Sequence, residues 1–289
     1  MRTWILSLLS AGLFLTGCAK KEEAARLTVV TSFYPMYLMT ANIVKDVPGV
    51  KLVNMAPPFS GCLHDYQMTP QDMKTLSQAD VLVINGAGME SFLDDAIRQN
   101  PKLTMIDASQ GIDLIVYQGT PNPHIFASVS GAMSQVRNIA TGLGNVDPEH
   151  TGYYRNNAGS YLARLDSLRN RMHLALKGVK NRNIITFHEA FPYFAREFGL
   201  NIVAVIEREP GSEPSAGELA QTIEIVRNNK VKALFAEPQY PAKSAQMIAK
   251  ETRAKVYILD PVVTGPMDDQ DYYITAMERN LTALQEALR

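Results

Sequence analysis

The sequence predicts an α/β protein of two lobes, each a parallel-rich sheet flanked by helices, with one long helix joining them. Short β-branched or apolar runs alternate with helical patterns over residues 27–107, and the alternation resumes after residue 180. Such alternation is typical of parallel sheets with helices packed on their faces. The chain has 289 residues, of which 46% are hydrophobic and 20% charged, which is ordinary for a globular protein. This length is sufficient for two lobes of usual domain size.

The first region contains four expected strands. Residues Asp80–Asn85 form a continuous apolar run, as expected for a strand buried on both faces of a parallel sheet. Thr69 and Pro70 make a favourable N-cap and first-turn pair for a helix. We expect strands at Leu27–Ser32, Val50–Met55, Asp80–Asn85 and Thr104–Asp107, and helices at Pro35–Lys45, Thr69–Gln78 and Phe92–Gln99.

The second region repeats this architecture without an internal sequence repeat. We expect strands at Asn183–Thr186, Asn201–Ile206, Ala233–Ala236 and Lys255–Leu259, and helices at Ala190–Phe198, Ala216–Asn228 and Ala242–Glu251. Between the regions lie a helical stretch at Ser128–Leu143 and a longer one from Pro148 to about Lys177. A helix of about 30 residues is about 45 Å long, enough to join two lobes. The predicted division is therefore an N-terminal lobe at 27–146, a linking helix at 147–179 and a C-terminal lobe at 180–289.

The N-terminus has the features of a bacterial export signal. Arg2 precedes a short apolar run, Trp4–Leu15, which is too short to span a bilayer comfortably. The run ends in Leu-Thr-Gly-Cys, which resembles a lipobox. The resemblance implies that residues 1–17 are a signal peptide, that Cys18 carries lipid and that 18–26 form a tether. We therefore expect an extracytoplasmic protein anchored to the bilayer by acyl chains, in the periplasm or on the outer face of the plasma membrane.

Charge and cysteine content exclude several classes. The net charge of −1 gives no indication of nucleic-acid binding. Only two cysteines are present, so lipidation of Cys18 would leave Cys62 without a disulfide partner. Cys62 lies two residues before His64 and could be a soft metal ligand or a redox-sensitive thiol. The favoured interpretation is a small buried residue in a turn.

Four residues in separate turn-rich segments are candidate metal ligands: His64, His124, His188 and Asp260. Imidazole nitrogens with a carboxylate oxygen suit zinc or a similar divalent ion. Each residue lies in a loop, and ligands of α/β lobes bind beyond the carboxyl ends of strands. Sequence spacing alone does not show that the four residues meet in space. The remaining histidines, His150 and His173, fall on the long helix and fit a structural role.

Several motifs resemble the metal-binding substrate-binding proteins of bacterial ABC importers, in that family's order and across residues 27–289. The motifs are His-Asp-Tyr before Thr-Pro-Gln-Asp, Leu-Ser-Gln-Ala-Asp-Val-Leu-Val, Asn-Pro-His, Phe-His-Glu-Ala-Phe-Pro-Tyr-Phe, Glu-Pro-Ser, Phe-Ala-Glu-Pro-Gln and Leu-Asp-Pro. The resemblance implies two lobes bridged by a long helix, with the metal in the cleft bound by His64, His124, His188 and Asp260. His at the third position is typical of zinc-binding members and Glu of manganese-binding ones, so His188 favours zinc.

The sequence also departs from many zinc-binding members of that family. It has no His-rich loop between the first two ligand motifs, and residue 63 is Leu where some members have an acid. Asp260 is therefore the preferred fourth ligand, and Glu237 is an alternative whose strand context favours a structural carboxylate.

The resemblance implies a monomeric zinc receptor that delivers the ion to an ABC permease and catalyses no reaction. A manganese receptor of the same family is one alternative. A zinc hydrolase is another, with Glu189 as the only obvious base, but the chain has no His-Glu-x-x-His motif. An adhesin or a zinc buffer with the same site is a third.

Overall fold

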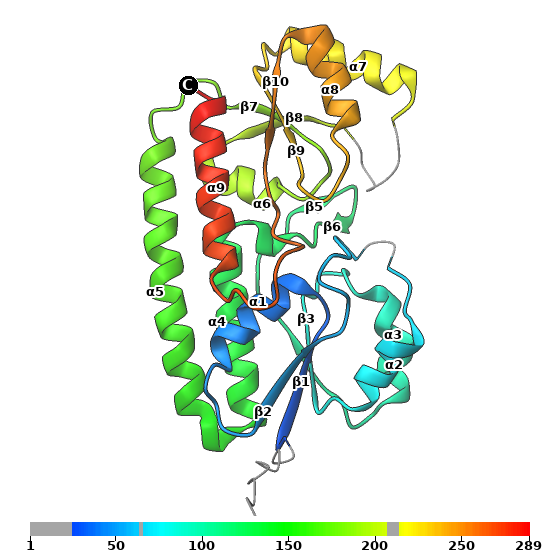
Figure 1. Cartoon of the computed structure of the whole chain (residues 1–289), viewed down its shortest axis with the longest axis vertical. Helices are drawn as coiled ribbons and strands as arrows, with labels where there is room; N and C mark the ends of the chain where they lie inside the picture. The colour runs from blue at the N-terminus through cyan, green and yellow to red at the C-terminus, as the bar shows by residue number, and fades with distance from the viewer. Residues whose placement is uncertain (1–24, 64–65, 207–213) are drawn as a thin grey trace, which may run out of the picture.

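The computed structural model describes residues 25–63, 66–206 and 214–289 (Figure 1). The predicted signal peptide, the lipidation site Cys18, most of the tether and the predicted ligand His64 lie outside the described residues. Within the described part of the chain, no helix combines the length and apolar character needed to cross a membrane.

The N-terminal lobe contains a four-stranded parallel sheet in the order β2-β1-β3-β4. All four expected strands form, because β-branched and apolar side chains favour strands. The elements are β1 (Leu27–Thr31), α1 (Tyr34–Ile43), β2 (Val50–Asn54), α2 (Pro70–Ser77), β3 (Val81–Ile84), α3 (Asp94–Gln99) and β4 (Thr104–Asp107). Helix α2 begins as predicted at Thr69, whose side chain forms a reciprocal capping box with Asp72.

The C-terminal lobe contains a second four-stranded parallel sheet, in the order β10-β9-β7-β8. Its elements are β7 (Asn183–Thr186), α6 (Pro192–Phe198), β8 (Asn201–Val205), α7 (Ala216–Asn228), β9 (Ala233–Ala236), α8 (Lys243–Thr252) and β10 (Lys255–Ile258). Helix α7 also begins with a capping box, between Ser215 and Glu218. The prediction of two α/β lobes is confirmed.

A pair of helices packed side by side connects the lobes, and the second of them is the predicted long helix. Helix α4 (Val129–Val146) leads through a turn to α5 (Thr151–Leu176), which extends along both lobes in Figure 1. The α-helix begins three residues later than predicted, because Pro148–His150 form a 3₁₀ turn. A short 3₁₀ turn is frequent where an α-helix starts.

One hydrophobic core extends through both lobes and the connecting helices. Side chains alternate across the strands: Val81 and Val83 face this shared core, while Leu82 packs in a smaller cluster on the outer face of the sheet. In the other lobe, Phe235 faces the shared core and Leu234 faces an outer cluster. The period of two residues thus gives each sheet one face toward the molecule's centre and one toward its own outer helices.

A last helix, α9 (Tyr272–Ala287), was not predicted from the sequence. Its buried residues Tyr273, Ala276, Met277, Asn280 and Leu284 have helical spacing, so the pattern was present in the sequence. The helix packs along α5, and the segment before it crosses to the first lobe (Figure 1). There Tyr34 donates a hydrogen bond to the carbonyl of Pro266 at 2.8 Å.

Two smaller predictions were wrong at their boundaries. The helix expected from Ala190 begins at Pro192, because residues 188–191 form a turn that carries His188 into the interior. The helix expected from Phe92 is a 3₁₀ turn followed by α3. A short antiparallel ribbon, β5 (Val116–Tyr117) with β6 (Thr120–Pro121), was not predicted. The lobe boundaries at residues 146 and 180 stay a prediction.

Candidate metal centre

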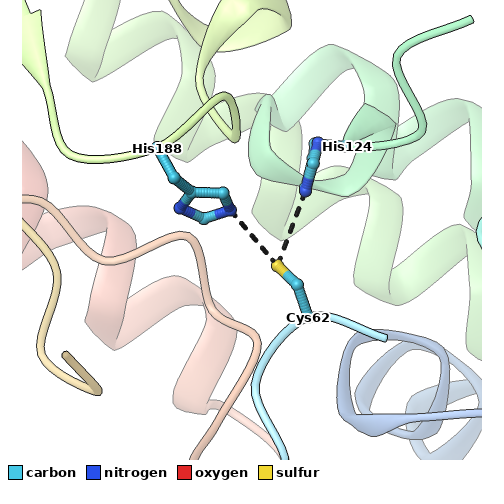
Figure 2. Close-up of side chains that lie close together, drawn as sticks. All are labelled: Cys62, His124 and His188. Carbon is cyan, nitrogen blue, oxygen red and sulfur yellow. Dashed lines mark hydrogen bonds between the residues drawn. The ribbon is translucent and has the colours of Figure 1, made fainter. Parts of the chain in front are cut away.

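Segments that follow strand ends in both lobes meet around a buried group of metal-ligating side chains. Cys62 lies between β2 and α2, His124 follows the β5–β6 ribbon, and His188 follows β7. Figure 2 shows the three side chains pointing toward one another from separate parts of the chain. Carboxyl ends of parallel strands are the usual position of binding sites in α/β folds. We call these three residues the Cys–His cluster.

The cluster is compact and largely buried. The Sγ atom of Cys62 lies 3.4 Å from Nε2 of His188 and 3.5 Å from Nε2 of His124. One ligand atom from each residue lies within 4.8 Å of the other two. Exposed fractions are 9% for Cys62, 2% for His124 and 1% for His188. The two imidazole rings stand edge to face, with centroids 5.3 Å apart.

A buried carboxylate orients His188. Nδ1 of His188 is in close contact with Oε1 of Glu237, which follows β9. The other carboxylate oxygen of Glu237 accepts a hydrogen bond from Gln239 at 2.7 Å. Because Nδ1 is engaged, Nε2 is the nitrogen that His188 presents to the cluster. The contact with His188 agrees with a supporting role for Glu237, which stays a prediction.

The charge balance at His188 follows from this pair. Burial by itself would lower the pKa of His188, but the charge of Glu237 and the contacts with Cys62 and Glu237 outweigh burial. Together they raise the pKa of His188 from its ordinary 6.5 to about 10. Burial raises the pKa of the Cys62 thiol, and contact with His188 opposes that change.

A neutral amide orients His124. Oδ1 of Asn122 lies 3.2 Å from Nδ1 of His124 and accepts a hydrogen bond from its backbone N–H at 3.0 Å. Nε2 of His124 is thereby directed to Cys62. The amide nitrogen of Asn122 donates to the carbonyl of Glu189 at 2.9 Å, which connects this loop to the turn containing His188.

Asp260 is buried nearby but does not belong to the cluster. It follows β10 and is 5% exposed. Its Oδ1 accepts a hydrogen bond from the backbone of Val262 at 2.8 Å. Within the described part of the chain, the contacts of its Oδ2 are longer, at 3.5 Å to the hydroxyl of Tyr272 and 3.9 Å to Arg279. Burial raises the pKa of Asp260, partly offset by Val262 and Arg279.

The structure thus brings together two of the four predicted ligands, His124 and His188. It places Asp260 outside the group, and His64 lies beyond the residues that can be described. The structure adds Cys62 to the group, whereas the sequence favoured a small buried residue in a turn. The available signal was its position two residues before a candidate ligand, in a loop with strong turn formers.

The arrangement defines a class: a two-lobed binding protein with a buried group of metal-ligating side chains between its lobes. A family model described as "Zinc-uptake complex component A periplasmic" matches residues 29–287. The chain belongs to this family, which confirms the family prediction made from the sequence motifs.

Three individual proteins illustrate the similarity. The high-affinity zinc uptake system protein ZnuA of Bacillus subtilis is 32% identical, over 92% of this chain and 89% of that protein. The zinc-binding lipoprotein AdcA of Streptococcus pneumoniae is 28% identical, over 97% of this chain but only 60% of that longer protein. The solved structure of the protein FpvC from Pseudomonas aeruginosa in complex with Mn2+ superposes with a TM-score of 0.82 at 32% identity, covering 91% of this chain and 98% of that one.

Proposed function

We propose that this protein is an extracytoplasmic receptor that binds zinc with high affinity and delivers it to an ABC import permease. The observation that carries the proposal is the convergence of two buried, oriented imidazole Nε2 atoms beyond the strand ends of two lobes. Membership of the zinc-uptake family and the zinc-binding relatives support the same conclusion.

His64, His124 and His188 are the proposed nitrogen ligands. Asp260 is the proposed carboxylate. Its Oδ1 is held by the backbone of Val262, and among the described residues its Oδ2 has a contact of 3.5 Å with the hydroxyl of Tyr272. Nitrogen ligands favour zinc over manganese, which prefers oxygen. Zinc is the proposed cargo, and a manganese receptor is the alternative that metal competition would reveal.

Binding and release, rather than catalysis, would be the protein's activity. A hydrolytic zinc site keeps an open position for water and a base beside it. The chain has no His-Glu-x-x-His motif, which would place such a base beside the metal. We therefore propose no hydrolytic step, and zinc-dependent cleavage of ester or peptide substrates would contradict this view.

The first experiment is competitive binding of zinc, manganese, nickel and iron(II) to the chelator-stripped protein. We expect one tight zinc equivalent, greatly weakened in His188→Ala. His173→Ala is the matched control, because that histidine lies on α5 with 47% of its side chain exposed. Preference for manganese, or equal affinity of the two variants, would contradict the proposed ligand set.

The remaining steps concern location and partner. We propose that Cys18 carries the lipid anchor, that the protein acts as a monomer and that zinc passes to a permease. Cys18→Ala should move the protein from the membrane fraction to the soluble fraction. Deletion of the gene should impair growth only when zinc is scarce, and added zinc should restore it. Unchanged growth under zinc limitation would argue for a buffer or an adhesin instead.

A further inference from the structure

The thiol of Cys62 is positioned as a ligand atom rather than as a packing group. Cys62 lies in the loop before helix α2 of the N-terminal lobe. The path of this loop depends on Gly61, which has a φ of +74°. A Cβ atom at residue 61 would lie 3.0 Å from the hydroxyl oxygen of Tyr240. Close approach of the loop backbone to Tyr240 therefore places the next residue, Cys62, against the histidines.

The two sulfur–nitrogen distances within the cluster match those of a tetrahedral zinc site. With zinc–sulfur bonds of about 2.3 Å and zinc–nitrogen bonds of about 2.0–2.1 Å, sulfur and nitrogen lie about 3.5 Å apart in a tetrahedron. The observed separations of Sγ from the two Nε2 atoms are 3.4 and 3.5 Å. Each sulfur–nitrogen pair is therefore spaced as two ligands of one zinc ion would be.

In each imidazole, Nδ1 already contacts a neighbouring side chain, so Nε2 is the nitrogen that faces the cluster. Nδ1 of His188 contacts Glu237, and Nδ1 of His124 contacts Asn122. Partners of this kind fix the orientation of metal-binding histidines in proteins. Sulfur and both Nε2 atoms are at hydrogen-bonding distance, and an ion bound between them would replace these hydrogen bonds.

We propose that Cys62 coordinates the metal as a thiolate together with His124 and His188, and that its sulfur makes the site selective for zinc over manganese. The proposal rests on the metal-receptor function proposed above and deepens it. On binding, the thiol proton leaves to solvent, a zinc–sulfur bond forms and no redox change occurs. Soft thiolate ligands favour zinc, whereas manganese prefers oxygen ligands.

The sulfur ligand changes the expected coordination set. A closed zinc site is usually four-coordinate. Cys62, His124 and His188 fill three positions, which leaves one position for His64 or Asp260. The sulfur thus revises the ligand set proposed above: because Asp260 lies outside the cluster and its Oδ1 is held by Val262, Cys62 takes the position proposed there for the carboxylate.

Cobalt(II) substitution tests the proposal directly. The protein should be the full chain with Cys18→Ser, so that Cys62 is its only thiol. We expect the cobalt complex to show a thiolate-to-cobalt charge-transfer band in the near ultraviolet. The band should disappear in Cys62→Ser and Cys62→Ala. X-ray absorption of the zinc form should independently show a sulfur neighbour at about 2.3 Å.

Metal affinities provide the second measurement. Cys62→Ser should weaken zinc by at least about tenfold, the lower end of effects seen when metal-site partners are removed. Manganese should change less, so that the zinc-to-manganese preference falls. Leu63→Val is the matched control, because it trims the neighbouring buried side chain without removing a donor atom.

The outcomes separate this proposal from the receptor function. Tight zinc binding without a charge-transfer band or a sulfur neighbour would overturn the role of Cys62 and leave the receptor function standing. Failure of the unsubstituted protein to bind any of the metals would overturn the receptor function itself. Equal losses in Cys62→Ser and Leu63→Val would show that the loop's packing, not the sulfur, had been measured. Retention of the band in Cys62→Ala would also exclude a thiolate ligand.

Discussion

The two histidines of the cluster contact the same sulfur at nearly the same distance, yet the groups behind them differ in charge. His188 is held by the buried carboxylate of Glu237, and His124 by the neutral amide of Asn122. The carboxylate makes His188 more basic and supplies negative charge near a cation. The amide only orients His124. One lobe thus contributes a charged support and the other lobe a neutral one.

This difference predicts unequal consequences when the supports are altered. A charge that is buried and paired interacts more strongly than a neutral hydrogen bond. We therefore expect the C-terminal lobe to govern the strength and pH dependence of binding. We expect the N-terminal lobe to govern geometry.

Removing the charge behind His188 should have the largest effect. Glu237→Gln keeps a side chain of similar shape but no longer supplies negative charge, so zinc affinity should fall by about 10- to 100-fold. Competition with a zinc chelator measures the change. The control is Glu224→Gln, the same substitution at an exposed position on α7. Affinity equal to that of the control would show that Glu237 acts by packing alone.

The pH dependence of binding should come next in size. With a pKa of about 10, His188 carries a proton in the metal-free protein throughout the neutral range, and zinc must displace it. Zinc affinity should therefore rise with pH above 6.5, by up to about tenfold per pH unit for each proton displaced. An ordinary His pKa would instead give a loss only below about pH 6.

Calorimetry in buffers of different ionisation enthalpy counts the released protons, and Glu237→Gln should release fewer. The raised pKa also stabilises the metal-free fold below pH 6.5, and this contribution is lost as pH rises through about 10. A binding constant that stays flat from pH 7 to 9 would contradict the charged state of His188.

Altering the neutral support should have a smaller effect. Asn122→Ala removes a hydrogen bond of about 1 kcal/mol, so zinc affinity should fall by less than about tenfold. Asn122→Asp is the matched variant: it keeps an acceptor for His124 but loses the donor to the Glu189 carbonyl. If zinc affinity falls equally in both variants, the hydrogen bond to the Glu189 carbonyl contributes more to affinity than orientation of the His124 ring does.

The smallest expected change concerns stability. Gly61→Ala should destabilise the metal-free fold by about 1–2 kcal/mol, because a side chain at positive φ is strained. Tyr240→Phe should partly restore stability by removing the oxygen that the new Cβ would meet. Gly159→Ala on α5 is the control and should be neutral or stabilising, since nothing lies within 4 Å. Thermal unfolding measures all three, and a neutral Gly61→Ala would contradict the tight-loop argument.

Much of the architecture could be predicted because its signals are local. A few neighbouring residues are enough to predict the strand within Asp80–Asn85 and the helix starts capped by Thr69 and Ser215. Helix α9 was readable in the same way and was overlooked. The 3₁₀ turns before α3 and α5 could not be predicted from the sequence. At a helix start, the 3₁₀ and α-helical hydrogen-bond patterns differ little in energy.

The candidate site was only partly predictable. His124 and His188 were identified by residue type and family motifs. The orienting groups Glu237 and Asn122 were visible as motif residues, but the sequence does not say which atom each one contacts. Cys62 was the least predictable, since an isolated buried cysteine usually packs as a small hydrophobic residue.

The sequence by itself determined the two alternating lobes, the long helix between them, the family and the chemical type of the histidine ligands. Local hydrogen bonding and the periodicity of apolar side chains are sufficient to predict the lobes and the long helix. The family and the histidine ligands follow instead from motifs that resemble known proteins. Tertiary structure decided that Cys62, His124 and His188 share one buried space while Asp260 stands outside it. Residues so far apart in the chain meet only through the packing of both lobes on a common core, and sequence distance does not encode that packing.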